Sequence, residues 1–306
     1  MKVGYDKPLY ILPFDHRHHY AESFGYREPM TSERVAEVSA NKRVVYEAFK
    51  KSLAAGVPRD HLGVLVDEQY GTDILRDSVR NGFVTVMPTE KCGQHEFDFD
   101  FGDEFGRHIE EIDAAFAKVL VRHNPEGDAA MNQRQMLRLK QLSDYCHAHD
   151  RSYMFELIMP PEPAQLEKLG GDKAAFDLEL RPELMVRAMH EIQDFGIEPD
   201  VWKIEGFDRE EDCARVAGAA RRDGRDEVGC IVLGRGEDER KVTTWLQTAA
   251  SVPGFIGFAV GRSTFVEPLA AYRAQKITAD AASTEIARRF QRWIEVFETA
   301  RAEAVR

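Results

Sequence analysis

Three charged residues stand inside otherwise apolar runs of the 306-residue sequence, and their types could support covalent chemistry on a carbonyl group. Lys118 lies in FAKVLVRH, Glu156 in SYMFELIM and Lys203 in VWKIEGF. Their apolar neighbours predict that these side chains are buried, and charged side chains are almost never fully buried unless they are paired. The pattern predicts an internal polar cluster that is either a catalytic site or a buried ion-pair network.

Lys203 is the best candidate for a nucleophile because Trp202 and Ile204 flank it in an apolar run. Burial and a second ammonium group at Lys118 favour the neutral amine that a Schiff-base nucleophile needs. Glu156 could accept and donate the protons of carbinolamine formation and dehydration. On the sequence alone, a Lys–Glu ion pair that only stabilises the fold explains the same residues equally well.

Two glycine–arginine segments near the end of the chain could bind an anion. They close the seventh and eighth apolar runs and read Gly234-Arg235-Gly236 and Gly261-Arg262-Ser263. Glycine lets backbone N–H groups approach an anion closely, and a following helix start adds a favourable dipole. We expect a phosphate site here, with Arg235 as an alternative ligand for a second anionic group. An ordinary strand-to-helix turn is the plainer interpretation of Gly234 and Gly236.

The DHRHH segment offers Asp15, His16 and His18 as an alternative, metal-binding site. Histidine and carboxylate groups are typical ligands of zinc and other divalent ions. Apart from His123, no other strand end supplies a convincing histidine, so we expect no metal and no other cofactor. The acidic segment 94–104 is interpreted as a solvated loop, with a mobile lid as the alternative.

The elements that must position these residues alternate between short apolar runs and longer amphipathic stretches. Eight runs of 7–8 residues are nearly continuous in Val, Ile, Leu and Phe, as strands buried on both faces are. They are Leu9–Asp15, Leu62–Glu68, Phe83–Glu90, Phe116–His123, Ser152–Met159, Val201–Phe207, Gly229–Gly236 and Phe255–Arg262. Helical spacing of apolar residues predicts helices over 33–55, 131–148, 182–194, 209–222, 237–250 and the last 30 residues.

Eight strand–helix units over about 250 residues predict an α/β fold, a (β/α)8 TIM barrel with an extra C-terminal helix. An open doubly wound sheet is the alternative, but eight runs favour the barrel. No linker or composition shift divides the chain, so we expect one domain over 1–306. In such a barrel the polar residues that end the strands meet at one mouth.

The composition disfavours several classes of partner. The 41 Lys and Arg against 53 Asp and Glu give a net charge of −12, which repels nucleic acid and anionic lipid. The cysteines Cys92, Cys146, Cys213 and Cys230 are too far apart to predict a zinc site or a disulfide framework. The N-terminal segment lacks a secretory signal, and no window of about 18 apolar residues occurs, so we expect a cytoplasmic protein. We also expect a homo-oligomer that takes a small-molecule substrate.

Six ordered segments resemble the barrel of class I aldolases of the tagatose-1,6-bisphosphate aldolase type: LYILPFDHR, LVDEQYG, EKCG, FELIMPP, VWKIEG and FAVGRSTF. They are more similar still to the 2-deoxy-5-keto-D-gluconate 6-phosphate aldolase-like domain of inositol catabolism, a domain of DUF2090 type. The resemblance extends from Leu9 to Phe265. It implies a carbon–carbon lyase, an aldehyde-lyase that uses a Schiff base.

By position, the resemblance implies that Lys203 is the Schiff-base lysine and Glu156 the acid/base. Lys118 would hydrogen-bond substrate hydroxyls, and Asp15 would orient or stabilise the cationic intermediate. The remaining substrate- and phosphate-binding positions would be Arg17, Gly234, Arg235, Gly236, Gly261 and Arg262. The seventh run departs from the family, because VLGRG replaces a serine–alanine–glycine turn, and 160–180 is an insertion beside the mouth.

The activity that the resemblance implies is cleavage of a phosphorylated keto sugar or keto sugar acid, such as 2-deoxy-5-keto-gluconate 6-phosphate. The products would be dihydroxyacetone phosphate and an aldehyde. One alternative is a metal-dependent aldolase or isomerase that uses Asp15, His16 and His18. The other is a non-catalytic barrel that only binds a sugar phosphate.

Overall fold

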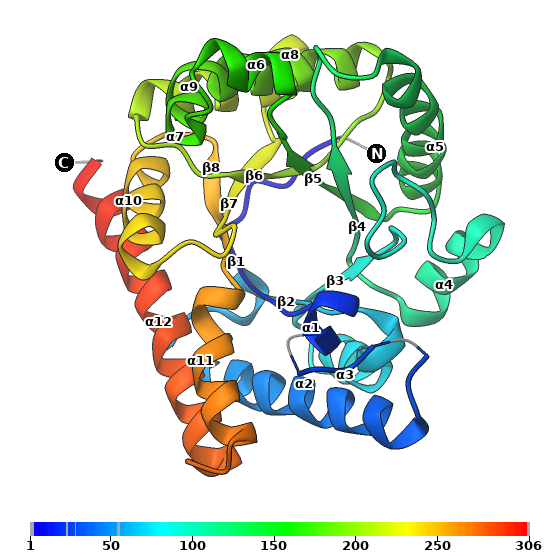
Figure 1. The fold of residues 1–306 in the computed structure, drawn as a ribbon, viewed down its shortest axis with the longest axis vertical. Helices are drawn as coiled ribbons and strands as arrows, with labels where there is room; N and C mark the ends of the chain where they lie inside the picture. The colour runs from blue at the N-terminus through cyan, green and yellow to red at the C-terminus, as the bar shows by residue number, and fades with distance from the viewer. Residues whose placement is uncertain (1–2, 23, 28, 54–55, 305–306) are drawn as a thin grey trace.

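Eight parallel strands close into a barrel in chain order, and β8 pairs with β1 (Figure 1). The computed structural model describes residues 3–22, 24–27, 29–53 and 56–304. The strands are β1 (Leu9–Pro13), β2 (Leu62–Leu65), β3 (Val84–Pro88), β4 (Phe116–Arg122), β5 (Ser152–Ile158), β6 (Val201–Glu205), β7 (Gly229–Leu233) and β8 (Phe255–Ala259). Each apolar run contains one of these strands, which confirms the predicted barrel.

The helices form an outer layer around the strands (Figure 1). The α-helices are α1 (His18–Glu22), α2 (Ser32–Ser52), α3 (Glu68–Arg80), α4 (Phe105–Ile112), α5 (Ala129–Ala148), α6 (Pro163–Lys168), α7 (Lys173–Ala175), α8 (Arg181–Asp194), α9 (Glu210–Ala220), α10 (Glu239–Ala250), α11 (Arg262–Arg273) and α12 (Ala279–Ala304). Short 3₁₀ turns are η2 (Arg59–His61), η3 (Gly102–Glu104) and η5 (Arg222–Gly224), and η4 (Phe176–Leu180) is a π-helix. The predicted helices are confirmed, except that residues 54–55 of the first lie outside the described residues.

Aspartates define where several of the helices begin. The side chains of Asp67, Asp128 and Asp238 accept hydrogen bonds from first-turn N–H groups of α3, α5 and α10. Such caps satisfy N–H groups that have no partner within the helix. The loops after β2, β4 and β7 therefore each end at a defined residue.

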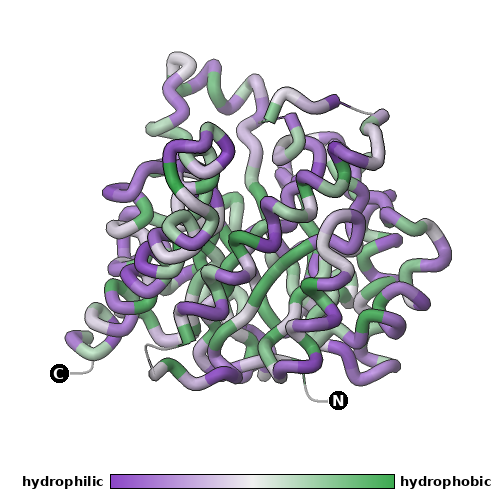
Figure 2. Tube along the Cα trace, turned by 90° about the horizontal axis from the view of Figure 1, so that it is seen from below, coloured by the Kyte–Doolittle hydropathy of each residue, from purple (hydrophilic) through white to green (hydrophobic). Residues whose placement is uncertain are grey.

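Side-chain alternation along the strands brings the polar residues into the barrel. Phe116, Met154 and Val201 belong to the apolar cluster inside the barrel. Successive side chains of a strand point to opposite faces, so residues two positions further on point inward again. These residues are Lys118, Glu156 and Lys203, one layer closer to the mouth. Figure 2 shows hydrophobic strands gathered in the middle and more hydrophilic segments outside.

The long helix α12 is additional to the eight strand–helix units and packs against α2, α10 and α11 of the same chain. Its buried residues include Ile286, Phe290 and Phe297, which share helical spacing. The indole Nε1 of Trp293 donates a hydrogen bond of 3.0 Å to Oγ1 of Thr264 in α11. The predicted extra C-terminal helix is confirmed. No helix within the described ranges is long and apolar enough to cross a bilayer.

The acidic segment 94–104 differs from the expected solvated loop. Phe97 and Phe99 are buried in the core, Asp98 between them is exposed, and Glu96 and Asp100 on either side are partly exposed. Glu96 forms ion pairs with two arginines of α5, Arg134 and Arg138. The expectation was wrong because alternation of phenylalanine with acids lets one face of the segment pack while the other is solvated.

Candidate active site

All ten site residues predicted from the sequence line one cavity of about 580 Å³ at the carboxyl end of the barrel. They are Asp15, Arg17, Lys118, Glu156, Lys203, Gly234, Arg235, Gly236, Gly261 and Arg262. Barrel enzymes place their active sites at this end, and the volume suits a small molecule. A larger hollow of about 790 Å³ between α2, α3 and the start of α12 contains none of these residues. We therefore place the candidate site in the smaller cavity.

Lys203 and Glu156 lie side by side because β5 and β6 pair with these two residues in register. Nζ of Lys203 is 2.8 Å from Oε2 of Glu156, and the same oxygen is 2.7 Å from Nζ of Lys118. All three side chains are buried. One carboxylate oxygen thus lies at ion-pair distance from two amines, and Lys203 is close enough to Glu156 to exchange a proton with it once the two groups align.

Lys118 is surrounded by carboxylates. Besides Glu156, its Nζ contacts Oδ2 of Asp15 at 3.0 Å and Oε1 of Glu90 at 2.7 Å. Two of the three N–H donors of this ammonium group form hydrogen bonds, to Asp15 and Glu90, and Glu156 lies at ion-pair distance from the same nitrogen. Burial favours the neutral amine, but these carboxylates outweigh it and raise the pKa of Lys118 well above its ordinary value. Lys118 is a fixed positive charge, and a substrate hydroxyl can accept from it only if one carboxylate moves away.

The carboxyl groups of this cluster differ in their protonation. Burial raises the pKa of each, and the neighbouring cations oppose this effect. For Asp15 and Glu156 the positive charges of Lys118 and Lys203 outweigh burial, so the pKa of both carboxyls is below its ordinary value. For Glu90 burial outweighs the cations, and its pKa is raised. Asp15 and Glu156 are therefore ionised at neutral pH, and Glu90 is the most readily protonated of the three.

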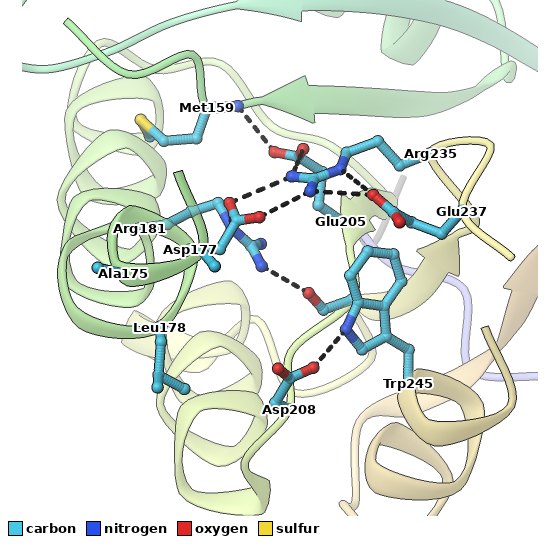
Figure 3. Close-up of polar contacts among 12 residues, drawn as sticks. Met159, Ala175, Asp177, Leu178, Arg181, Glu205, Asp208, Arg235, Glu237 and Trp245 are labelled. Atoms are coloured by element: carbon cyan, nitrogen blue, oxygen red, sulfur yellow. Dashed lines mark hydrogen bonds and ion pairs between the residues drawn. The ribbon is translucent and has the colours of Figure 1, made fainter. Parts of the chain in front are cut away.

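Arg235 lies among carboxylates from three parts of the chain, as Figure 3 shows. Its guanidinium is 2.6 Å from Asp177 in the insertion, 3.1 Å from Glu205 on β6 and 3.1 Å from Glu237 in its own loop. The expectation that Arg235 binds a substrate anion does not fit this arrangement, because protein carboxylates already compensate its charge. The contacts instead join the insertion before α8 to the loop after β7.

Arg17 is engaged in a similar way. Its Nη1 is 2.6 Å from Oδ2 of Asp100, and its Nη2 donates to the backbone carbonyl of Glu90. The side chain is buried. The expected role in substrate binding does not fit these partners either, since Arg17 ties the acidic segment to the start of the barrel and holds Glu90 in place.

The loops after β7 and β8 meet at Arg262, the first residue of α11. Arg262 donates to the backbone carbonyl of Arg235, and no carboxylate of the described residues pairs with its exposed guanidinium. Gly236 has a φ of 82°, and a Cβ atom there would lie 2.5 Å from Cζ of Arg262. The positive φ favours glycine at this position, and its lack of a Cβ atom leaves room for the end of the Arg262 side chain. A free guanidinium, a helix start and glycine-lined backbone together form a suitable anion site.

The alternative metal site is not assembled in the part of the chain that the structure describes. No three His, Cys, Asp or Glu side chains there are grouped as metal ligands would be. Asp15 binds Lys118 instead, and the ring of His16 packs edge-on against Phe265, with the ring centres 6.3 Å apart. Burial lowers the pKa of His16 to about 4, so this imidazole is neutral at neutral pH.

Four carboxylates that complete the site carry weaker signals in the sequence. Glu90 and Glu205 share the inward face of their strands with Pro88 and Lys203, so alternation could have placed them. Asp100 and Asp177 come from irregular segments, where no periodic pattern indicates a direction. The structure is needed to show that Asp100 pairs with Arg17 and that Asp177 pairs with Arg235.

The fold is shared with aldolases of known structure. Fructose-bisphosphate aldolase from Plasmodium falciparum has a TM-score of 0.67 and 11% identity, covering 97% of this chain and 98% of that chain. Fructose-bisphosphate aldolase from Slackia heliotrinireducens has a TM-score of 0.54 and 13% identity, covering 91% and 85%. The YdjI aldolase from Escherichia coli K12 has a TM-score of 0.55 and 9% identity, covering 95% and 91%. At these identities the likeness shows the fold alone.

Comparison of the sequence itself gives a family. Among curated proteins, none matches this sequence. The family model DUF2090, described as an uncharacterized protein conserved in bacteria, matches residues 3–301. The match includes every strand of the barrel and most of α12, and it confirms the DUF2090-type resemblance. This chain belongs to the DUF2090 family.

Proposed function

We propose that this protein is a class I, Schiff-base aldolase that cleaves a phosphorylated keto sugar or keto sugar acid. The observation that carries the proposal is the 2.8 Å contact between Nζ of Lys203 and Glu156 inside the barrel mouth. Imine formation needs a nucleophilic amine in contact with a group that transfers protons. The fold shared with three aldolases supports the same class of reaction.

The first chemical step joins Lys203 to the substrate ketone. Lys203 passes a proton to Glu156 and attacks the carbonyl carbon as a neutral amine. Glu156 then returns the proton to the carbinolamine hydroxyl, which leaves as water, and an iminium ion remains. The ionised carboxylate of Asp15, which lies close enough to feel the charge of Lys203, stabilises this cation.

The second step breaks the carbon–carbon bond. Glu156, again ionised, takes the proton of the hydroxyl on the carbon β to the iminium carbon. The electrons of the bond between the α and β carbons move into the iminium, so an aldehyde leaves and an enamine stays on Lys203. Protonation of the enamine carbon and hydrolysis of the resulting imine release the ketone product.

The proposed anion site would orient the substrate in the cavity. Phosphate would bind the guanidinium of Arg262 with the backbone at Gly234, Gly236 and Gly261 and the start of α11. With the ketone at Lys203 and the phosphate on the adjacent carbon, the product would be dihydroxyacetone phosphate. 2-Deoxy-5-keto-gluconate 6-phosphate has this arrangement, and we propose it as a representative substrate.

Reductive trapping tests the proposal. Incubation with radiolabelled dihydroxyacetone phosphate and borohydride should attach the label covalently, because borohydride reduces the imine to a stable secondary amine. Lys203→Met should abolish labelling, and Lys241→Met should leave it unchanged, since Nζ of Lys241 pairs with Asp208 outside the cavity. Labelling that survives in Lys203→Met would refute the assignment.

Two further measurements separate the alternatives. A metal-dependent enzyme would lose cleavage activity in EDTA, and we expect activity to persist. A barrel that only binds sugar phosphates would gain thermal stability with dihydroxyacetone phosphate but would give no adduct after borohydride treatment.

A further inference from the structure

The enamine that stays on Lys203 after bond cleavage must take up a proton on carbon, and the steps described above assign no donor for it. A good donor is an acid whose pKa lies near the working pH and whose side chain reaches the cavity. Lys118, His16 and Tyr20 line the cavity but are poor donors. The pKa of Lys118 and that of Tyr20 are raised, so both hold their protons, and His16, with a pKa of about 4, is already neutral.

Glu90 is a better placed acid. Pro88 on β3 pairs in register with Lys118 on β4, and Glu90 follows Pro88 by two residues. Side chains alternate along a strand, so Glu90 takes the next inward position toward the mouth. It is 7% exposed and lines the same cavity as Glu156 and Lys203. A substrate that reaches Lys203 from the mouth therefore shares the cavity with this side chain.

The two carboxyl oxygens of Glu90 differ in their partners. Oε1 accepts a hydrogen bond from Nζ of Lys118 at 2.7 Å, whereas Oε2 is buried and has no hydrogen-bond partner among the described residues. A proton on Oε2 removes the buried charge and leaves Oε1 as the acceptor for Lys118. Burial also raises the pKa of Glu90, whereas that of Glu156 is lowered. Neighbouring carboxyls whose pKa values are pushed apart in this way are suited to separate acid and base roles.

We infer that Glu90 is a second acid of the reaction and protonates the enamine carbon, while Glu156 handles the protons of imine formation and bond cleavage. The proton leaves Oε2, the electron pair of the enamine forms the new C–H bond, and the nitrogen of Lys203 becomes part of an iminium ion again. Glu90 is then a carboxylate, and Glu156 still holds the proton of the substrate hydroxyl. Lys118, which is 2.7 Å from both glutamates, gives one proton to Glu90 and takes one from Glu156, so both return to their starting states. The inference rests on the proposed function, because the enamine forms only if Lys203 makes an imine.

Exchange of hydrogen for deuterium on dihydroxyacetone phosphate isolates this step. The ketone forms the imine without a second substrate, and the group that protonates the enamine removes the same hydrogen in the reverse direction. Glu90→Gln keeps an oxygen that can accept from Lys118 but cannot transfer the proton. Proton NMR in deuterium oxide should show exchange at the hydroxymethyl carbon about 10²–10⁴-fold slower in this variant, whereas borohydride should still attach the ligand to Lys203. Glu198→Gln, which alters a carboxylate that pairs with Arg225 outside the cavity, should match the unmodified protein in both measurements.

Glu90→Ala provides a second measurement, because it leaves space for a small carboxylic acid. Sodium formate should raise the exchange rate of Glu90→Ala and have no effect on Glu90→Gln, in which the amide fills that space. An unmodified exchange rate in Glu90→Gln, no rescue of Glu90→Ala by formate, or loss of borohydride labelling together with exchange would overturn the inference. Absence of labelling in the unmodified protein would instead refute the proposed function, so the two failures are distinguishable.

Discussion

Lys118 organises the charges of the site more than any other residue. Its ammonium contacts Asp15, Glu90 and Glu156 at 2.7–3.0 Å, and together with Lys203 it keeps the buried carboxyls of Asp15 and Glu156 ionised. A buried ion cluster contributes little net free energy while it is complete, but loss of one partner leaves uncompensated charges. Lys118 therefore affects both the stability of the barrel and the pKa of Glu156.

Replacing Lys118 by methionine should lower the free energy of unfolding at pH 7 by about 3–5 kcal/mol, because three carboxylates lose their shared cation and only the ion pair of Glu156 with Lys203 remains. Urea unfolding measures the change. Lys241→Met removes an exposed pair with Asp208 and should cost less than about 1 kcal/mol. Equal costs for the two variants would contradict this role of Lys118.

The charge cluster also predicts how the stability of the Lys118→Met variant changes with pH. In the unmodified protein the pKa of Asp15 and Glu156 is below the unfolded value of about 4, so their contribution exists above pH 4 and disappears as the pH falls further. Without Lys118, Glu156 keeps its ion pair with Lys203, but Asp15 loses its nearest cation, so we expect burial to raise the pKa of Asp15 above the unfolded value and acidification from pH 7 to 4 to stabilise the variant. The difference in free energy of unfolding between the unmodified protein and Lys118→Met should therefore be smaller at pH 4 than at pH 7. A difference that does not change with pH would contradict this account of the charge cluster.

At the scale of elements, strand register and alternation explain most of what the sequence predicted. Lys118, Glu156 and Lys203 could be placed in one cluster because each follows an inward apolar residue by two positions on neighbouring strands. The partners of Arg17 and Arg235 could not be foreseen, because Asp100 and Asp177 lie in irregular segments. A charged residue at a strand end therefore predicts a place at the mouth but leaves open whether the charge is free for a ligand.

The insertion before α8 offers a test at this scale. Asp177 pairs with both Arg235 and Arg181, whereas the neighbouring Glu179 is exposed and has no described ion pair. Asp177→Asn should weaken the attachment of the insertion by about 1–2 kcal/mol, which corresponds to roughly 5–30-fold faster amide exchange over 173–180. Glu179→Gln should leave exchange unchanged. Equal protection in both variants would show that other contacts hold the insertion.

For the whole molecule, α12 covers the flank formed by α2, α10 and α11 and adds to the core beyond the eight strand–helix units. The apolar spacing in the last 30 residues predicted this helix but not the surface on which it packs, because spacing defines an apolar face without identifying its partner. Trp293 links α12 to α11, since its side chain is buried and donates a hydrogen bond to Thr264, the third residue of α11. The helix α11, which begins at the proposed phosphate site, thus packs against the C-terminal helix α12.

Truncation of Trp293 should therefore destabilise the whole barrel. Trp293→Ala should cost about 3–5 kcal/mol in the free energy of unfolding, because it leaves a cavity beneath α12. Trp293→Phe keeps most of the packing and loses the hydrogen bond to Thr264, so about 1–2 kcal/mol is expected. Urea unfolding with a single transition checks both; an Ala variant as stable as the Phe variant would mean that α12 adds little to the core.

The chemistry proposed for this barrel depends on which amine meets the ketone. Peptide mass mapping after borohydride reduction in the presence of dihydroxyacetone phosphate identifies the modified residue directly. We expect the adduct on the β6 peptide, at Lys203. An adduct on Lys118, Lys91 or any other lysine, or no adduct at all, would contradict the mechanism.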